Sequence, residues 1–167
     1  TAAEIRKLGA EVLAVTADVT KAGDMARFVE QTVQRFGRID ILVNNAGATG
    51  QSPFDAVDDA AWQHDIEIKV MAHVRTARAV IPHMKQQGGG RIINLNMVGA
   101  KHPDARQFPT TVSRAAGLAL TKGLSKELAG ANILVNAVAV GKIKSMQQQR
   151  RAAGDGRAQP AASGRQH

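Results

Sequence analysis

The chain has 167 residues, a hydrophobic fraction of 44% and no cysteine. This length favours one domain with a real core, and the missing cysteine excludes disulfides, thiolate metal sites and a cysteine nucleophile. No apolar run reaches the roughly 18 residues that a membrane helix needs, so we expect no membrane span and a cytoplasmic protein. The net charge is +8, and residues 142–167 carry +5 of it, from six Lys or Arg and one Asp.

The first half of the chain alternates helical and extended patterns. Residues 2–8 favour a helix that Gly9 ends, and 11–19 favour a short buried strand. Apolar residues then recur at helical spacing up to Gly37, a typical helix stop, and Thr20 can cap this helix. A second apolar strand is predicted over 39–43, and it runs into Asn-Asn-Ala-Gly.

The second half repeats this alternation. Asp58 or Asp59 can cap a long helix from Trp62 to Met84, and Pro82 is expected to kink its last turn. Residues 91–95 favour a third strand. Residues 109–128 favour a helix, because Pro109 and the hydroxyls that follow it suit the start of a helix. Residues 133–140 favour a fourth strand.

Strands that alternate with helices predict a parallel sheet covered by helices, which is a doubly wound α/β fold. In such folds ligands bind beyond the carboxyl ends of the strands. We place this domain at residues 1–145. Residues 146–167 contain no Val, Ile, Leu, Phe or Trp, and we expect them to be a basic, disordered tail. The tail lacks aromatic residues for base stacking, so nucleic acid is not expected as a partner.

Five segments in order resemble the short-chain dehydrogenase/reductase family. They are Ala-Asp-Val at 17–19, Asp-Ile-Leu-Val-Asn-Asn-Ala-Gly at 40–47, Gly-Gly-Arg-Ile-Ile-Asn at 89–94, the helix at 109–128, and Ile-Leu-Val-Asn-Ala-Val-Ala-Val-Gly at 133–141. The resemblance implies an incomplete Rossmann-like fold that lacks the first two strands and the Gly-rich phosphate-binding turn. In the strand order of that fold, two strands belong between 11–17 and 39–43, a gap of roughly 14 Å. We therefore expect an unpaired edge on the second of these strands, and a chain that is poorly stable or that re-pairs the two strands.

The resemblance also implies a nicotinamide dinucleotide, NAD or NADP. Asp18 and the amide of Val19 match the positions that bind the adenine amino group. Asn44, Ala46 and Gly47 match those beside the adenosine ribose, and Gly141 follows Val140 where relatives have a Pro-Gly at the nicotinamide. The alternative interpretation of Asn-Asn-Ala-Gly is a structural turn.

The catalytic positions differ from those of the family. Its Asn, Ser, Tyr and Lys correspond to Lys69, Met97, Thr110 and Arg114, and the chain has no tyrosine. Met97 offers no hydroxyl donor, and Thr110 is shorter and less acidic than a phenol. Arg114 retains a positive charge that could bind ribose hydroxyls. Ser113 and Lys101 are the candidates for a different arrangement; otherwise they are a helix-entry residue and a solvated loop lysine.

Two functions remain open at this point. The first is an NAD(P)-dependent oxidoreductase, or a fragment derived from one, that transfers hydride between the nicotinamide and a small alcohol or carbonyl substrate. The second is a catalytically inactive family member, a pseudoenzyme that acts as an interaction or structural subunit. In either case the resemblance implies a homo-oligomer formed through helices 62–84 and 109–128.

The five histidines do not have the spacing of a helical zinc site. His64 and His73 lie nine residues apart rather than four, so no metal site is expected. His73 falls near the inner face of its helix or at a surface or interface.

Overall fold

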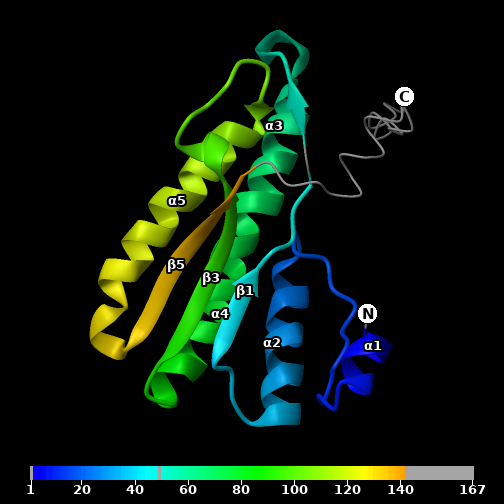
Figure 1. Ribbon diagram of the computed structural model, residues 1–167, viewed down its shortest axis with the longest axis vertical. Coiled ribbons are helices and arrows are strands. Elements are labelled where there is room, and N and C mark those ends of the chain that lie inside the picture. Colours follow the sequence, from blue (N-terminus) through cyan, green and yellow to red (C-terminus); the bar gives the residue numbers. More distant parts are fainter. Residues whose placement is uncertain (1, 49, 142–167) are drawn as a thin grey trace.

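The computed structural model describes residues 2–48 and 50–141. The tail predicted at 146–167 and the domain boundary at 145 lie outside these residues. A parallel sheet of three strands has the order β1 (Ile41–Asn44), β3 (Gly90–Met97), β5 (Ile133–Val140). Figure 1 shows the long helices α4 (Ala72–Gln86) and α5 (Thr110–Glu127) on one face of this sheet. The α/β fold with a parallel sheet is therefore confirmed.

The predicted helix ends are largely correct, but Thr20 does not cap α2, because the N-cap is Lys21 without a side-chain hydrogen bond and the Thr20 hydroxyl bonds Asp18. Helix α1 spans Ala2–Lys7, and α2 spans Ala22–Phe36 and ends at Gly37, whose φ of 77° is the left-handed conformation that glycine adopts easily. Asp58 caps α3 (Asp59–Ile66) by accepting a hydrogen bond from the amide of Ala61. A five-residue π-helical turn, η2 (Glu67–Met71), joins α3 to α4.

Short elements complete the fold. A two-stranded antiparallel ladder, which the sequence did not predict, joins β2 (Gln51–Ser52) to β4 (Phe108–Pro109). The single-turn helices are η1 (Phe54–Ala56), η3 (Val98–Ala100) and η4 (Ala129–Ala131). The entrance of α5 differs from expectation, because no side chain caps it and the Thr111 hydroxyl bonds the Gln107 carbonyl instead.

The strand predicted over 11–19 is wrong. This segment joins no ladder among the described residues, and it lies beside α2, where Arg27 Nη2 donates to the Thr16 carbonyl at 3.0 Å. The expected re-pairing with the strand at 39–43 is also absent from the described part of the chain. The expected open edge is present, because β1 is the outer strand of its sheet. A segment becomes a strand only when another strand supplies its ladder partner.

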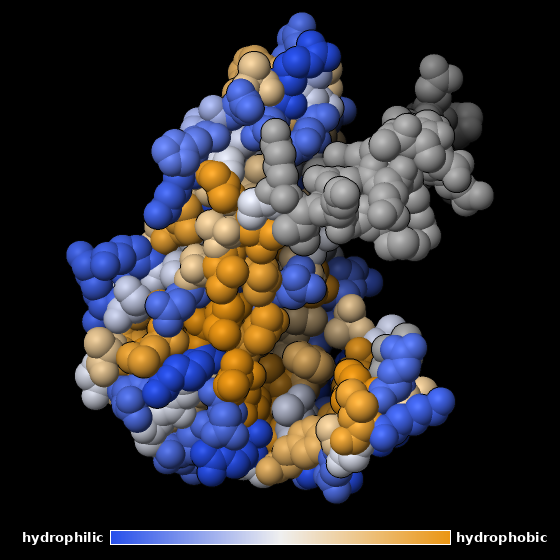
Figure 2. Space-filling view, viewed as in Figure 1, coloured by the Kyte–Doolittle hydropathy of each residue, from blue (hydrophilic) through white to orange (hydrophobic). Residues whose placement is uncertain are grey.

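Helices cover one face of the sheet and leave the other face exposed. Toward α4 and α5 the strands bury a compact apolar core, which includes Leu42, Val80, Met84, Ile92, Leu128 and Ile133. On the opposite face, Ile41 is 60% exposed, Val43 52%, Leu134 44% and Val138 48%. Figure 2 shows this face as a band of apolar surface along the strands. The helices described here therefore leave one face of the sheet exposed.

Candidate functional site

A buried polar cluster joins α3, η2 and the start of α5. Lys69 in η2 is 1% exposed, and its Nζ donates to the Asp65 carboxylate and, at 2.7 Å, to Thr110 Oγ1. Ser113 Oγ donates to the second Asp65 oxygen at 2.5 Å, and Thr110 Oγ1 donates to the Gly50 carbonyl. Burial lowers the pKa of the Lys69 ammonium, and the Asp65 carboxylate opposes that shift. The cluster is a closed network in which each buried charged group has a partner.

This network brings together two of the four positions that match the family's catalytic residues. Lys69 bonds directly to Thr110, while Ser113, one of the alternative candidates, bonds to Asp65. Thr110 and Ser113 are 3% and 0% exposed, so neither hydroxyl faces solvent. Lys101 is exposed and takes no part in the network. Sequence analysis missed Asp65, although its spacing of four residues from Lys69 on a helix is a recognisable ion-pair signal.

Arg114 packs between the ends of two strands. Its Nη1 donates to the Leu95 carbonyl at 2.7 Å. Its Nη2 lies only 2.9 Å from the point where a Cβ atom on residue 47 would sit, so the guanidinium packs tightly against Gly47. Burial lowers the pKa of Arg114, and Asp65 opposes this. Two of the residues predicted to bind the cofactor, Gly47 and Arg114, are therefore neighbours.

Asn44 belongs to a second buried network that crosses the sheet. Its Nδ2 donates to Asn94 Oδ1 at 2.8 Å, and Asn94 Nδ2 donates to Thr121 Oγ1 at 2.9 Å. Thr76 Oγ1 donates to Asn44 Oδ1 at 2.7 Å. Each of these amides is buried and bonded, so the network ties β1 and β3 to the helices behind them. The Asn44 side chain points into the protein in this arrangement.

The predicted adenine-binding residues line an open hollow. Asp18 and Val19 border it together with Gly47, Ala48 and one side of α3, and its volume is about 800 Å³. The Asp18 carboxylate accepts hydrogen bonds from the amide and hydroxyl of Thr20 at 2.9 and 2.7 Å, and these bonds lower its pKa. Asp18 is therefore an anionic acceptor at neutral pH, on the same side of the molecule as Gly47.

A separate cavity of about 420 Å³ opens at the ends of β3 and β5. Met97 lines it together with Gly141, the residue predicted to border the nicotinamide. Two side chains that sequence analysis did not single out, His102 and Gln107, also line this cavity. Gln107 Oε1 is buried with no hydrogen-bond partner within the described residues.

His73 is more buried than a surface or interface position would be, because only 2% of it is exposed. Neither ring nitrogen has a hydrogen-bond partner in the part of the chain that the structure describes. Burial lowers its pKa to about 4, with a smaller contribution from Arg114. His73 is therefore a neutral imidazole at physiological pH.

Within residues 2–48 and 50–141, no group of three or more His, Cys, Asp or Glu side chains could hold a metal ion. The helices in these ranges are also too short or too polar to cross a membrane.

The fold is an α/β fold with a parallel sheet, a class in which ligands bind beyond the carboxyl ends of the strands. Residues 1–155 match the short chain dehydrogenase family, and the chain belongs to that family. It is 39% identical to pig "Dehydrogenase/reductase SDR family member 4" over 150 residues, which cover 87% of this chain and 52% of that protein. It is 36% identical to a Thermotoga maritima 3-oxoacyl-[acyl-carrier-protein] reductase over 77% of this chain and 52% of the relative.

Solved structures agree with this assignment. An NAD⁺-bound xylitol dehydrogenase superposes with a TM-score of 0.86 at 29% identity, over 90% of this chain and 58% of the other. A 7α-hydroxysteroid dehydrogenase complexed with NADH and 7-oxo glycochenodeoxycholic acid gives a TM-score of 0.79 at 30% identity, over 83% and 54%. The chain thus spans about half the length of the curated relatives it matches.

Proposed function

We propose that this chain contributes the adenosine- and nicotinamide-facing strand ends of an NAD(P)-dependent oxidoreductase. The single observation that supports this is that Asp18, Val19 and Gly47, from separate segments, line one hollow. An anionic acceptor beside a glycine backbone suits the amino group of an adenine ring and a close ribose. Relatives of the chain are named as dehydrogenases and reductases, and the solved neighbours include complexes with NAD⁺ and NADH.

Different residues of this chain would contact different parts of such a cofactor. Asp18 and Val19 would hold the adenine, Asn44, Ala46 and Gly47 would border the ribose, and Gly141 would border the nicotinamide. Arg114, at the position of the family's lysine, would supply positive charge for ribose hydroxyls. When bound, the nicotinamide supplies or accepts the hydride that is exchanged with an alcohol or carbonyl carbon. The proposal includes homo-oligomers formed through α3–α4 and α5, where Ala115, Ala119 and Gly123 are small and exposed.

A second candidate function is an inactive family member that acts as an interaction subunit. The observation that favours it is the bond between Lys69 Nζ and Thr110 Oγ1, which occupies the hydroxyl at the family's tyrosine position. Thr110 is buried and already paired, and Met97 has no proton to donate. Loss of one donor to a developing oxyanion typically costs roughly 10²–10³ in rate. The chain can therefore retain cofactor contacts without the usual proton-transfer group.

Cofactor titration tests the proposal. NADH and NADPH are each added to the full chain while the nicotinamide fluorescence is followed, and we expect saturable enhancement. Asp18→Ala should weaken binding roughly tenfold, since it removes one charged hydrogen-bond acceptor. Asp55→Ala, which removes an exposed carboxylate that lines neither that hollow nor the cavity beside Gly141, is the matched control and should leave the affinity unchanged. Absence of binding at millimolar cofactor would contradict the proposal.

Turnover separates the two candidate functions. Absorbance at the NADH band is followed with a panel of alcohols and ketones. Binding with turnover supports the oxidoreductase, whereas binding without turnover of any of them supports the inactive subunit.

A further inference from the structure

The cavity of about 420 Å³ at the ends of β3 and β5 is rich in hydrogen-bonding side chains. Two carboxamides, an imidazole and a carboxylate line it, and they belong to Gln51, Gln107, His102 and Asp104. Among the described residues, no Lys or Arg lines this cavity. A ligand there therefore meets both donors and acceptors, and the only fixed charge that it meets is negative.

Gln107 contributes unmet hydrogen-bonding capacity to this cavity. Its side-chain oxygen Oε1 is buried and has no hydrogen-bond partner within residues 2–48 and 50–141. This oxygen lies close to Gly99, where an added Cβ atom would be 3.0 Å from it. A buried amide oxygen without a donor is costly. Gln107 as a whole is half-buried, and the last torsion of a glutamine side chain is broad, so a rotation of the carboxamide brings Oε1 to a donor on a bound molecule.

The backbone that carries the two carboxamides is held by hydrogen bonds. The Gln107 carbonyl accepts from the amide and the hydroxyl of Thr111, at 3.0 and 3.2 Å. Gln51 lies in the β2–β4 ladder (Figure 1), and the Thr110 hydroxyl donates to the carbonyl of Gly50 next to it. The hydroxyl at the family's tyrosine position therefore anchors a wall of this cavity.

We propose that this cavity binds a polyhydroxylated substrate, a small sugar or polyol, and that Gln107 recognises one of its hydroxyl groups. The inference rests on the proposed function, because the alcohol substrate would then lie beside Gly141, which lines the same cavity. A hydroxyl group both donates and accepts. It can therefore supply the donor that Gln107 Oε1 lacks, while other hydroxyls of the same molecule pair with Gln51, His102 and Asp104.

Other substrate classes match these side chains less well. An aliphatic alcohol or ketone would desolvate several polar groups and leave them unpaired. A carboxylate or a phosphate ester would lie near the Asp104 carboxylate with no lining cation among the described residues to compensate. An amine would pair with Asp104, but an ammonium group has no acceptor for the side-chain N–H groups of Gln51 and Gln107.

Three six-carbon probes test the substrate class by NMR on the full ¹⁵N-labelled chain, with and without saturating NADH. Sorbitol carries a hydroxyl on every carbon, 1,6-hexanediol carries hydroxyls only at its ends, and 1,6-hexanediamine carries ammonium groups there. We expect sorbitol, added up to about 100 mM, to shift the side-chain amide resonances of Gln107 and to saturate, since this concentration exceeds ordinary KM values. The diol and the diamine should each bind roughly tenfold more weakly or worse, because they leave more of the polar groups unpaired.

Variants at Gln107 test its role, with the side-chain amide of Gln51 as the reporter. Gln107→Leu should weaken sorbitol binding roughly tenfold and leave the affinity for the diol unchanged. Gln107→Glu keeps a side-chain acceptor and should restore most of the affinity for sorbitol. Gln34→Leu is the matched control, because Gln34 is exposed on α2 and does not line the cavity, and it should bind sorbitol as the wild type does.

The inference is wrong if sorbitol and the diol bind equally, if the diamine binds more tightly than sorbitol, or if sorbitol at about 100 mM leaves the Gln107 amide unshifted. Wild-type sorbitol affinity in Gln107→Leu would also overturn it. Cofactor binding without selective sorbitol binding would remove this inference and leave the proposed oxidoreductase intact. Selective sorbitol binding by a chain that binds neither NADH nor NADPH would support the polyol site and contradict the proposed oxidoreductase.

Discussion

Lys69 Nζ lies 2.7 Å from Thr110 Oγ1 and is bonded at the same time to the Asp65 carboxylate. The two residues are 41 positions apart in the chain, so this bond ties the π-helical turn to the start of α5. The bond to Asp65 explains how the buried Lys69 ammonium is tolerated, since the carboxylate compensates its charge.

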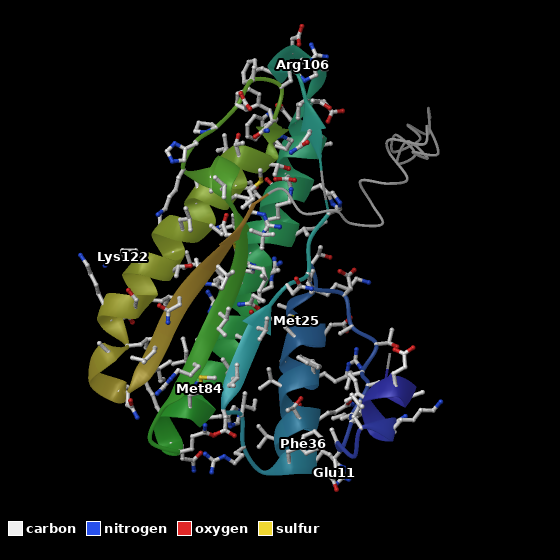
Figure 3. All side chains as sticks on the ribbon, viewed as in Figure 1. Glu11, Met25, Phe36, Met84, Arg106 and Lys122 are labelled. Carbon is white, nitrogen blue, oxygen red and sulfur yellow. The ribbon has the colours of Figure 1, made fainter. Side chains whose placement is uncertain are left out.

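Removal of the Lys69 ammonium should therefore destabilise the protein strongly. Lys69→Met leaves Asp65 buried without its counter-ion, and the free energy of unfolding should fall by about 3–5 kcal/mol. Lys122→Met is the matched control, because Lys122 is exposed on α5 and projects away from the sheet (Figure 3), and it should change stability by less than about 0.5 kcal/mol. Urea unfolding followed by Trp62 fluorescence measures both. Equal effects of the two substitutions would show that the buried ion pair contributes little.

Restoring the family's tyrosine should succeed only together with a change at Lys69. Thr110→Tyr alone forces a ring into a site that is 3% exposed and filled by the Lys69 ammonium, and we expect a loss of about 1–3 kcal/mol. Lys69→Asn replaces the lysine that fills this site with a shorter side chain. The double variant should then be more stable than the sum of the two single changes predicts, with a coupling of about 0.5–3 kcal/mol. A double-mutant cycle of unfolding free energies measures this coupling, and additive effects would contradict direct packing between the two positions.

The stability should fall as the pH falls below neutrality because of His73. Its pKa is about 4 in the folded chain and about 6.5 in an unfolded one. The unfolded state therefore binds more protons between these values, so the contribution is complete above pH 6.5 and is lost progressively toward pH 4. The difference between the two pKa values of His73 corresponds to about 3 kcal/mol of unfolding free energy.

The measurement is the unfolding free energy of the wild type and His73→Leu between pH 7.5 and 4.5. His73→Leu should flatten the slope over this range, because it removes the titrating group. His64→Leu, at an exposed helix position, should keep the wild-type slope. A wild-type slope in His73→Leu would assign the acid sensitivity to the carboxylates instead.

The sequence predicted the elements whose determinants are local. Gly37 ends α2 and Asp58 caps α3 through backbone conformations and hydrogen bonds that adjacent residues supply. The segment at 11–19 has a strand-like pattern but joins no ladder in the described chain, because a ladder depends on a neighbour that no local pattern encodes.

The candidate site was predictable to the same extent. Gly47 and Asp18 follow from a motif and line one hollow, whereas the bond between Lys69 and Thr110 depends on the packing of α5 against η2. The spacing of Asp65 and Lys69 predicts an ion pair on a helix surface, but their burial results from tertiary contacts.

Gly47→Ala tests whether close packing against Arg114 is what requires glycine at this position. The new Cβ would lie 2.9 Å from Arg114 Nη2, and the guanidinium is held by its bond to the Leu95 carbonyl. We therefore expect a loss of about 1–3 kcal/mol in unfolding free energy, and a smaller loss in an Arg114→Ala background. Gly123→Ala is the matched control. No atom lies within 4 Å of its added Cβ, so this substitution in an exposed helix should stabilise by about 0.5–1 kcal/mol. Thermal and urea unfolding of the four variants give these values. An equal loss from Gly47→Ala with and without Arg114 would show that another contact requires the glycine.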